Sequence, residues 1–395
     1  MRALPAGALP RLEAEPISSA RVRKALDNTL RILPGLAVAV GVMLLAGRVA
    51  QWVGAGVLRL QGLDPAGRAS PISGISMAIL LGLLAANTVG SAAILKPGLQ
   101  FAVKRMLRLG IICVGIRLSF FDVMKLGAWG VPVVAVIIVS ALVVTHLFAR
   151  GIGVSDNFGT LTAASTAICG VTAALSVGPV IDAEESEVAY AVANVTLFGL
   201  AAMLTYPYLA HALFGAHPAA AGLFLGTGIH DTSQVVGAAL SYKEIFRDER
   251  VLDVATVTKL TRNVFLVAIV PGLAFLHARR TGRAAGRVDL RKLFPLFVLG
   301  FLAMAIVRSI GDASVLSGGR ALGIWDGAAW KDVAKTVGET WGSAALGTAM
   351  AGVGLSTNLR ALRQLGGKPF AVGALSAALV AGLALVLAAL VGPRL

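Results

Sequence analysis

The sequence is poor in charge and in cysteine. Only 14% of its 395 residues are charged while 57% are hydrophobic, whereas soluble domains carry about 25% charged residues. A water-soluble globular protein is therefore nearly excluded. The only two cysteines, Cys113 and Cys169, lie inside apolar stretches and match no metal-ligand spacing. We interpret them as small core residues, and we expect no metal site.

Catalytic and cofactor-binding signatures are also missing. The chain has no G-x-x-x-x-G-K-[ST] loop, no H-E-x-x-H and no G-x-S-x-G, so ATP-driven pumping and zinc or serine hydrolysis have no sequence support. We expect no enzyme activity, no catalytic residue and no cofactor. An apolar core is absent before position 32, which predicts a cytoplasmic tail over residues 1–31 and argues against a cleaved signal peptide.

Eleven apolar runs bounded by Gly, Pro or charge dominate the rest of the chain. Their lengths predict membrane-spanning helices, and isolated strands cannot satisfy their backbone groups in lipid. The fold class is therefore an all-α polytopic membrane protein. The first run is short, so we expect residues 49–60 to lie along the outer interface. The predicted spans cover residues 32–47, 71–91, 97–118, 128–148, 158–180, 188–213, 219–240, 253–277, 292–310, 336–358 and 369–391.

Basic residues predict the orientation of these spans. With a cytoplasmic N-terminus, the inner segments hold 20 Lys and Arg and the outer segments hold 10, which favours this orientation over its inverse. The C-terminus is then periplasmic, and an acidic loop over residues 182–187 lies outside. The net charge of +15 follows mostly from topology, so we expect no nucleic-acid partner.

A weak internal repeat connects the two halves of the chain. The paired segments keep their order: LLG at 80–82 with FLG at 224–226, VKRMLR at 103–108 with VTKLTR at 257–262, and TAICGV at 166–171 with TAMAGV at 348–353. Residues 71–215 and 216–395 then form two five-span units after an extra first segment, 32–70. An odd number of spans inverts the second unit, as in many secondary transporters, which bind substrate near the midplane. Coincidence in a Gly- and Ala-rich chain is the alternative.

Two predicted spans, 158–180 and 336–358, are rich in Gly, Ser and Thr. A mid-helix Gly costs about 1 kcal/mol relative to Ala, so both spans are candidates for interruption, at Gly170 and Gly352. The half-helix N-termini of a broken helix attract an anion, with hydroxyl groups as extra donors. Close packing of small residues is the alternative. The candidate anion ligands here are Ser165, Thr166, Gly170, Thr172, Thr348, Gly352 and Ser356.

The stretch GTGIHDTSQVVG at 226–237 places five consecutive polar residues at the middle of a span. They are His230, Asp231, Thr232, Ser233 and Gln234. An ionised carboxylate at the bilayer centre costs about 2.5 to 3.5 kcal/mol, so it must be paired, protonated or in contact with water. We predict local unwinding or a hydrated cavity, with His230 and Asp231 as proton-coupling groups. A structural ion pair or a kink is the alternative.

Lys259 and Arg262 are the predicted cationic partners of this stretch. They lie three residues apart and share one helix face, and a guanidinium offers bidentate donors to an anion. Snorkelling to the outer interface is the rival interpretation. Their counterparts in the first unit, Arg105 and Arg108, are better explained as anchors at the cytoplasmic interface.

Several segments together resemble the YeiH family, described as candidate sulfate exporters of bacterial inner membranes. The resemblance covers about residues 32–392, and GIHDTSQVVGA followed by KLTRN is its specific part. The segments are RLGIICVGIRLSF (108–120), STAICGVTAA (165–174), TLFGLAAMLTYP (196–207), GIHDTSQVVGA (228–238), ATVTKLTRN (255–263) and GVGLSTNL (352–359).

The resemblance implies a relation to cation/proton antiporters and bile-acid-type symporters. It implies two inverted five-span repeats, crossed broken helices, a panel-like and a core subdomain, and elevator-like movement of the core. The His-Asp and Lys-x-x-Arg positions of the family carry over to His230, Asp231, Lys259 and Arg262. Sulfate as substrate follows from the resemblance alone.

Three hypotheses on function follow. The first is a secondary transporter of a small, sulfur-containing or similar anion in the bacterial inner membrane, coupled to protons or sodium. The second is a cation/proton antiporter that uses Asp231 as its ion-binding carboxylate, although two nearby cations argue against it. The third is a membrane receptor or scaffold, for which we expect a soluble partner domain that the sequence lacks. The sequence leaves a homodimer open.

Overall fold

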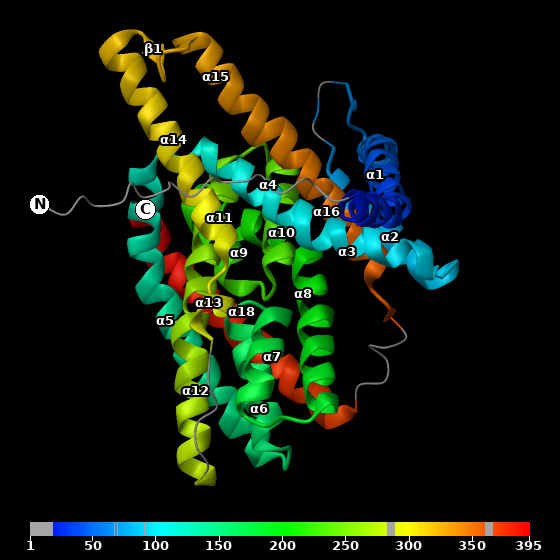
Figure 1. Cartoon of the computed structure of the whole chain (residues 1–395), viewed down its shortest axis with the longest axis vertical. Helices are drawn as coiled ribbons and strands as arrows, with labels where there is room; N and C mark the ends of the chain where they lie inside the picture. Colours follow the sequence, from blue (N-terminus) through cyan, green and yellow to red (C-terminus); the bar gives the residue numbers. More distant parts are fainter. Residues whose placement is uncertain (1–18, 67, 69, 91, 283–288, 360–365) are drawn as a thin grey trace, which may run out of the picture.

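Helices make up almost all of the structure, a computed structural model that describes residues 19–66, 68, 70–90, 92–282, 289–359 and 366–395 (Figure 1). The predicted all-α class is confirmed. The α-helices are α1 (Ser19–Leu60), α2 (Gly74–Thr88), α3 (Lys96–Phe101), α4 (Leu107–Val114), α5 (Phe120–Gly151), α6 (Asp156–Ala167), α7 (Val171–Val177), α8 (Glu185–Phe214), α9 (Pro218–Gly228), α10 (Thr232–Phe246), α11 (Arg250–Val264), α12 (Leu266–Thr281), α13 (Leu290–Leu293), α14 (Leu296–Gly318), α15 (Gly327–Lys335), α16 (Gly342–Ser356) and α18 (Gly367–Val391).

Short irregular helices and one small hairpin join these elements. The hairpin pairs Arg320 with Asp326 in antiparallel register. The remaining elements are the 3-10 helices η1 (Ala93–Leu95), η3 (Gly115–Arg117), η4 (Gly178–Val180) and η6 (Gly392–Arg394), the π-helices η2 (Ala102–Met106) and η5 (Thr336–Trp341), and the strands β1 (Arg320–Ala321) and β2 (Trp325–Asp326).

Six of the described helices are long and apolar enough to cross a membrane, which confirms a multi-pass membrane protein. They are Thr29–Leu60, Phe120–Gly151, Glu185–Phe214, Arg250–Thr281, Leu296–Gly318 and Gly367–Arg394. The number of eleven spans is not supported, because the predicted spans at 158–180 and 219–240 each form two short helices.

The first helix is also longer than predicted. Residues 1–18 of the predicted tail lie outside the described residues, while α1 starts at Ser19 and continues without interruption to Leu60. Residues 49–60 therefore continue the first helix, and their position along the outer interface stays a prediction. A buried apolar stripe of Ala46, Ala50 and Leu58 extends the helix past Arg48.

Helices α6 and α7 form a hairpin that enters from the lower end of the molecule as drawn in Figure 1. The start of α6 contacts the segment that follows α7: Ser155 Oγ donates a hydrogen bond to Glu187, and Asn157 Nδ2 donates one to the Asp182 carbonyl at 3.5 Å. Helix α7 therefore returns to the end from which α6 started. The tip of this lower hairpin is Ile168–Gly170, where Gly170 has φ +66°.

Helices α9 and α10 form a second hairpin, which enters from the upper end. At that end, the ring of His211 near the end of α8 stacks on Phe246 at the end of α10, with 3.7 Å between ring centroids. His211 Nδ1 also lies 3.2 Å from the Tyr242 hydroxyl. Helix α10 thus returns to where α9 began, and the tip of this upper hairpin is Ile229–Asp231.

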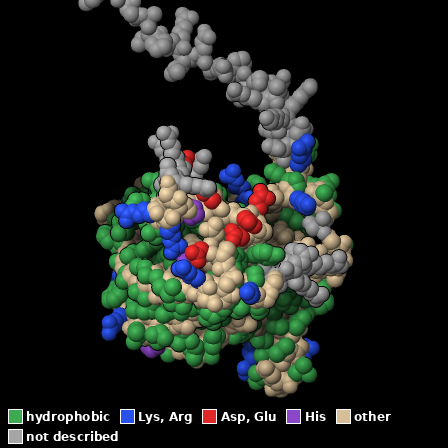
Figure 2. All heavy atoms as spheres, turned by 90° about the horizontal axis from the view of Figure 1, so that it is seen from below, with side chains coloured by type: hydrophobic (Ala, Val, Ile, Leu, Met, Phe, Trp, Pro, Cys, Tyr) green, Lys and Arg blue, Asp and Glu red, His purple; other side chains and the backbone are tan. Residues whose placement is uncertain are grey.

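The lower hairpin changes the side assigned to one loop. The acidic segment 182–187 lies at the same end as Arg150, not at the opposite end, because α6 and α7 do not cross. Contacts of Asp182 with His277 and of Asp156 with Arg280, both at 3.6 Å, place the end of α12 there too. Figure 2 shows this end from below, with charged side chains gathered on it and apolar side chains over the flanks.

The helices pack as two groups, α5–α12 with α18 and α1–α4 with α14–α16. Helix α10 lies where the groups meet: Ser241 Oγ is 3.0 Å from Ser76 Oγ of α2, and Gly237 faces Met350 of α16. The hairpins thus belong to one group and contact the other through one helix.

Helix α16 is continuous through Gly352, so the predicted interruption of this span is wrong. Its glycines allow close approach to neighbouring helices: a Cβ on Gly354 would lie 2.4 Å from the Ile79 carbonyl oxygen, and one on Gly352 would lie 3.1 Å from the Ala102 Cβ. The packing alternative therefore explains this segment. TAICGV and TAMAGV do not correspond in structure, since only the first forms a hairpin tip.

Gly170→Ala is expected to destabilise the lower hairpin. The backbone at φ +66° and ψ −124° is one that L-residues avoid, and the added Cβ would lie 2.8 Å from Asp231 Oδ2. We expect a loss of about 1 to 3 kcal/mol, read as a lower unfolding temperature in detergent. Gly41→Ala is the control, because its Cβ would meet no atom within 4 Å. Equal melting of both variants would contradict the tip geometry.

Candidate functional site

The two hairpin tips meet inside the protein. A Cβ built on Gly170 of the lower tip would lie within 3.1 Å of three atoms of Asp231 in the upper tip. His230 is buried, with 2% exposure, and the last turn of α6 is buried throughout. Four half-helix ends thus converge: the C-termini of α6 and α9 and the N-termini of α7 and α10.

Arg262 joins the two C-termini. Its side chain is fully buried, and all of its nitrogen atoms donate to backbone carbonyls. Nε and Nη2 bind the lower hairpin, at Ala167 O (2.8 Å) and Thr166 O (2.7 Å). Nη1 binds the upper hairpin, at Thr227 O (2.6 Å), Ile229 O (2.9 Å) and Gly226 O (3.3 Å). One guanidinium therefore ties together the carbonyl ends of α6 and α9.

Lys259 makes the same kind of bridge one turn earlier on α11. Its buried Nζ donates to Ile168 O at 2.9 Å, to Ile229 O at 3.4 Å and to the carbonyl of His230. An ammonium has three N–H groups, and these three carbonyls account for them. Snorkelling is excluded because neither cation reaches the surface. In the structure both cations bind the protein backbone and hold the tips in position, while their direct contact with an anion stays a prediction.

The position of these cations along α11 places the tips deep in the molecule. Helix α11 starts at Arg250 at the upper end, and Arg262 lies about 18 Å from this start at 1.5 Å per residue. Positive charge near helix C-termini is stabilising. The same cations satisfy carbonyl groups that lipid cannot satisfy.

Asp231 caps the N-terminus of α10. Its Oδ1 accepts hydrogen bonds from Ser233 N (2.9 Å) and Ser233 Oγ (2.6 Å), while Gln234 Oε1 accepts from Asp231 N at 3.0 Å. This capping box is the local reason for the start of α10. The carboxylate itself is only half-buried, and its Oδ2 faces Gly170.

The N-terminus of α7 has no side-chain cap, because its N-cap residue is Gly170. Its first turn carries Thr172, which is exposed. On the upper tip, half-buried Thr232 pairs with Asn263, whose Nδ2 donates to Oγ1 at 3.1 Å. The free face of the crossing point therefore presents two helix N-termini, hydroxyl groups and one carboxylate.

The charges at this crossing point sum to a positive surplus. A helix end carries about half an elementary charge, so the two N-termini and the two C-termini cancel. Lys259 and Arg262 outnumber Asp231 by about one positive charge. Such a surplus, next to uncapped backbone N–H groups, favours an anion over a cation.

The structure gathers most of the predicted residues but not all. Residues of the crossing hairpins and of α11 lie together: Ser165, Thr166, Gly170, Thr172, His230, Asp231, Thr232, Ser233, Gln234, Lys259 and Arg262. Thr348, Gly352 and Ser356 lie away from the tips in α16, where Thr348 Oγ1 donates to Ala344 O at 2.8 Å. Gly352 packs on Ala102 and Val103.

Two residues of α8 at the tips are absent from the sequence-based prediction. Gln234 Nε2 donates to Val195 O at 3.3 Å, and a Cβ on Gly199 would lie 1.9 Å from Gln234 Oε1. Gly199 therefore makes room for the capping box. A Gly inside a long apolar helix is the one signal that the sequence offers for it. Within the described part of the chain, no group of three or more His, Cys, Asp or Glu could hold a metal ion.

The fold and the crossing tips define a multi-pass membrane protein with two opposed re-entrant hairpins. The family model described as Conserved hypothetical protein 698 matches residues 43–373. A UPF0324 membrane protein of Streptococcus pyogenes serotype M18 is 31% identical over 312 residues, which cover 78% of this chain and 87% of the relative. No solved structure matches.

Other bacteria have similar proteins. A UPF0324 membrane protein of Bacillus cereus is 30% identical over 312 residues, covering 79% of this chain and 85% of the relative. One from Fusobacterium nucleatum is 26% identical over 309 residues, covering 76% and 86%. The chain belongs to the UPF0324 (YeiH) family, and the resemblance inferred from the sequence is confirmed.

Arg262→Lys is expected to loosen the two tips. The variant keeps the charge but loses the planar fork that reaches both hairpins, and we expect destabilisation by about 3 kcal/mol. Unfolding temperature and hydrogen exchange of residues 166–170 and 226–231 measure the effect. Arg105→Lys, on an exposed position of η2, is the control and should change stability by less than about 0.5 kcal/mol. Unchanged exchange in Arg262→Lys would rule out the bridge.

Proposed function

We propose that this protein is a secondary active transporter of a small anion. The observation that carries the proposal is the half-buried Asp231 carboxylate, placed between the N-termini of two half-helices that enter from opposite ends. Half-helix N-termini that point at an anionic substrate group are a feature of secondary transporters. The proposal assigns no catalytic residue and no cofactor.

Asp231 occupies the place between the N-termini of α7 and α10 where the substrate anion would bind. The carboxylate acts as an internal anion for α10 and lies beside the uncapped α7. Protonation of Asp231 removes its charge and leaves the positive helix ends to the substrate. Binding of an anion and binding of a proton are therefore linked at one site, which couples anion movement to the proton gradient. Sodium coupling has no comparable support in the geometry.

His230 fits the coupling role less well. Its backbone carbonyl binds Lys259, and its Nδ1 is buried without a partner among the described residues. A proton on this ring would add a third positive charge beside Lys259 and Arg262 without a nearby carboxylate of its own. We therefore assign the coupling proton to Asp231 and a structural role to His230.

Each hairpin is followed by a long helical segment, and these two units support an inverted repeat. The repeat unit is then one hairpin and one membrane-spanning segment, which is shorter than five spans. The lower hairpin is followed by α8, and the upper hairpin by α11 and α12, with opposite directions. The helices that follow the two hairpins, α8 and α11, share a sequence motif: VANVT at 192–196 and VATVT at 254–258. Both units lie in one helix group, so an elevator-like movement of that group against α1–α4 and α14–α16 would carry the tips with it.

The substrate class comes from the family resemblance. Sulfate, sulfite or an organosulfur anion fits a site with backbone N–H and hydroxyl donors, and the bacterial inner membrane with a cytoplasmic N-terminus fits the distribution of Lys and Arg. Export is the direction that the resemblance implies. The second candidate is a cation/proton antiporter with Asp231 as the ion ligand, which the half-buried carboxylate favours and the positive surplus opposes.

Asp231→Asn is expected to flatten the pH dependence of anion flux. Asn still caps a helix but cannot exchange a proton. In proteoliposomes loaded with radiolabelled sulfate or sulfite, wild-type flux should change by up to about tenfold per pH unit, because one proton is exchanged for each anion. The flux of the variant should vary by less than about twofold over the same series of pH values. A pH profile like that of the wild type would remove Asp231 from coupling.

Asp326→Asn is the matched control for this experiment. Asp326 caps α15 through Ala328 N and Ala329 N, far from the hairpin tips in sequence and in the fold, and its substitution should leave the pH profile unchanged. The rival function is tested in the same liposomes without sulfate. A cation/proton antiporter would move protons in response to a sodium gradient, whereas an anion transporter would not.

A further inference from the structure

A second basic site lies at the upper end, outside the crossing tips. A cavity of about 540 Å³ opens between α5 and α11 of one helix group and η3, α14 and α15 of the other. Pockets of this volume hold small molecules together with water. Six basic residues line it: Arg117, Lys125, Arg250, Arg308, Lys331 and Lys335. We call this cavity the basic vestibule.

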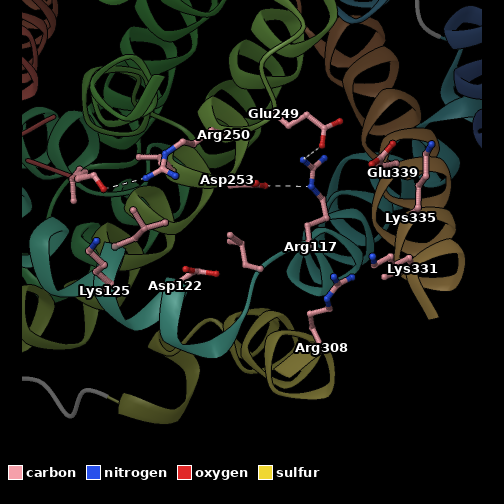
Figure 3. Close-up of a pocket in the computed structure, with 15 residues that line it drawn as sticks. Arg117, Asp122, Lys125, Glu249, Arg250, Asp253, Arg308, Lys331, Lys335 and Glu339 are labelled. Carbon is pink, nitrogen blue, oxygen red and sulfur yellow. Dashed lines mark hydrogen bonds and ion pairs between the residues drawn. The ribbon is translucent and has the colours of Figure 1, made fainter. Parts of the chain in front are cut away.

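Arg117 is the buried basic residue of the vestibule, and neighbouring carboxylates hold its side chain in place. Its side chain is only 8% exposed and points into the space between the two helix groups (Figure 3). Nη2 donates to Glu249 Oε2 at 2.7 Å, and Nε lies 3.3 Å from Asp253 Oδ1. Nη1 is buried and has no hydrogen-bond partner among the described residues. A buried donor without a partner costs free energy that a ligand would recover.

The acidic residues of the vestibule do not cancel its charge. Glu249 is shared between Arg117 and Lys243, whose Nζ lies 2.8 Å from Oε1. Burial raises the pKa of the Glu249 carboxyl, but the hydrogen bond from Lys243 and the charge of Arg117 outweigh burial and hold the pKa below its ordinary value. Asp122 accepts hydrogen bonds from Ser119 at the start of α5.

Of the five other basic residues of the vestibule, two have partners and three are available to a ligand. Arg308 binds Asp312, and Arg250 donates to the Leu395 carbonyl. The other three basic residues, Lys125, Lys331 and Lys335, have no carboxylate partner in the described part of the chain. Two acids of the lining, Asp122 and Glu339, have no basic partner there. In Figure 3, Lys331 and Lys335 extend from α15 on one side of Arg117, and Lys125 lies on the other.

We infer that the basic vestibule binds a small, multiply charged oxyanion beside Nη1 of Arg117, attracted by the positive charge of the unpaired lysines that line the cavity, Lys125, Lys331 and Lys335. A planar guanidinium and several ammonium groups around one space are the donors that sulfate or phosphate groups take. The oxyanion is either free in solution or the phosphate of a lipid headgroup. The vestibule is distinct from the tips. Its lining residue Asp253 lies on α11, 9 residues before Arg262, which binds the tips.

Equilibrium binding of radiolabelled sulfate to the full-length protein in detergent tests the inference without transport. The variant Lys125→Gln/Lys331→Gln/Lys335→Gln removes the three unpaired cations, and Arg117→Lys removes Nη1 while keeping a cation for Glu249 and Asp253. Each should weaken the class of sulfate sites that belongs to the vestibule by about tenfold or more and leave binding at the tips unchanged. Lys96→Gln, at an exposed position of α3, is the control and should bind like the wild type.

Two further arms separate the sources of the oxyanion and guard against misfolding. Unfolding temperatures without sulfate must agree between variants and control. Nanodiscs of phosphatidylcholine and of phosphatidylglycerol then show whether an anionic headgroup competes with sulfate, which would assign the site to lipid. If the triple lysine variant and Arg117→Lys bind both sulfate and phosphatidylglycerol as the wild type does, the inference is overturned. Loss of sulfate binding with intact pH-dependent flux would leave the transport proposal standing.

Discussion

Two buried cations hold the centre of this protein together by binding helix carbonyls. A helix that stops inside a membrane leaves its last carbonyl groups without partners, and lipid supplies none. Lys259 and Arg262 provide these partners for α6 and α9 together, from one face of α11. The two hairpins can therefore end at mid-depth, and the crossing of their tips depends on this one pair of side chains.

The bridge also determines the charge at the N-termini of α7 and α10, which lie opposite the two cations at the tips. Because the cations neutralise the C-termini of α6 and α9, the positive N-termini of α7 and α10 have only Asp231 to compensate them, and Asp231 caps α10 alone. Asp231 is the single carboxylate between them within the described tips, and it is half-buried while the cations are fully buried. The protein thus keeps a fixed positive background and one carboxylate that water can reach, which is a suitable arrangement for exchange between a proton and an anion.

Much of this centre can be predicted from the sequence, but its topology cannot. Five adjacent polar residues at 230–234 in an apolar run indicate an unwound segment, and Gly170 indicates a break. Both are present. Hydropathy does not distinguish a crossing helix from a hairpin of two half-length helices, since 158–180 has enough apolar residues for either. The predicted break at Gly352 is wrong because small residues serve close packing as often as interruption. The acceptors of Lys259 and Arg262 are backbone carbonyls, which no residue type encodes.

Accessibility of single cysteines from each side of the membrane tests the opposed hairpins most directly. In a background with Cys113→Ser and Cys169→Ala, the exposed positions Gly151 and Ser186 flank the lower hairpin, while the exposed Ala216 and the half-buried Asp248 flank the upper one. Single cysteines at 151 and 186 should react with an impermeant maleimide from one side, and those at 216 and 248 from the other. Labelling of 151 and 186 from opposite sides would mean that α6 and α7 cross the membrane, which would contradict the pair of opposed hairpins.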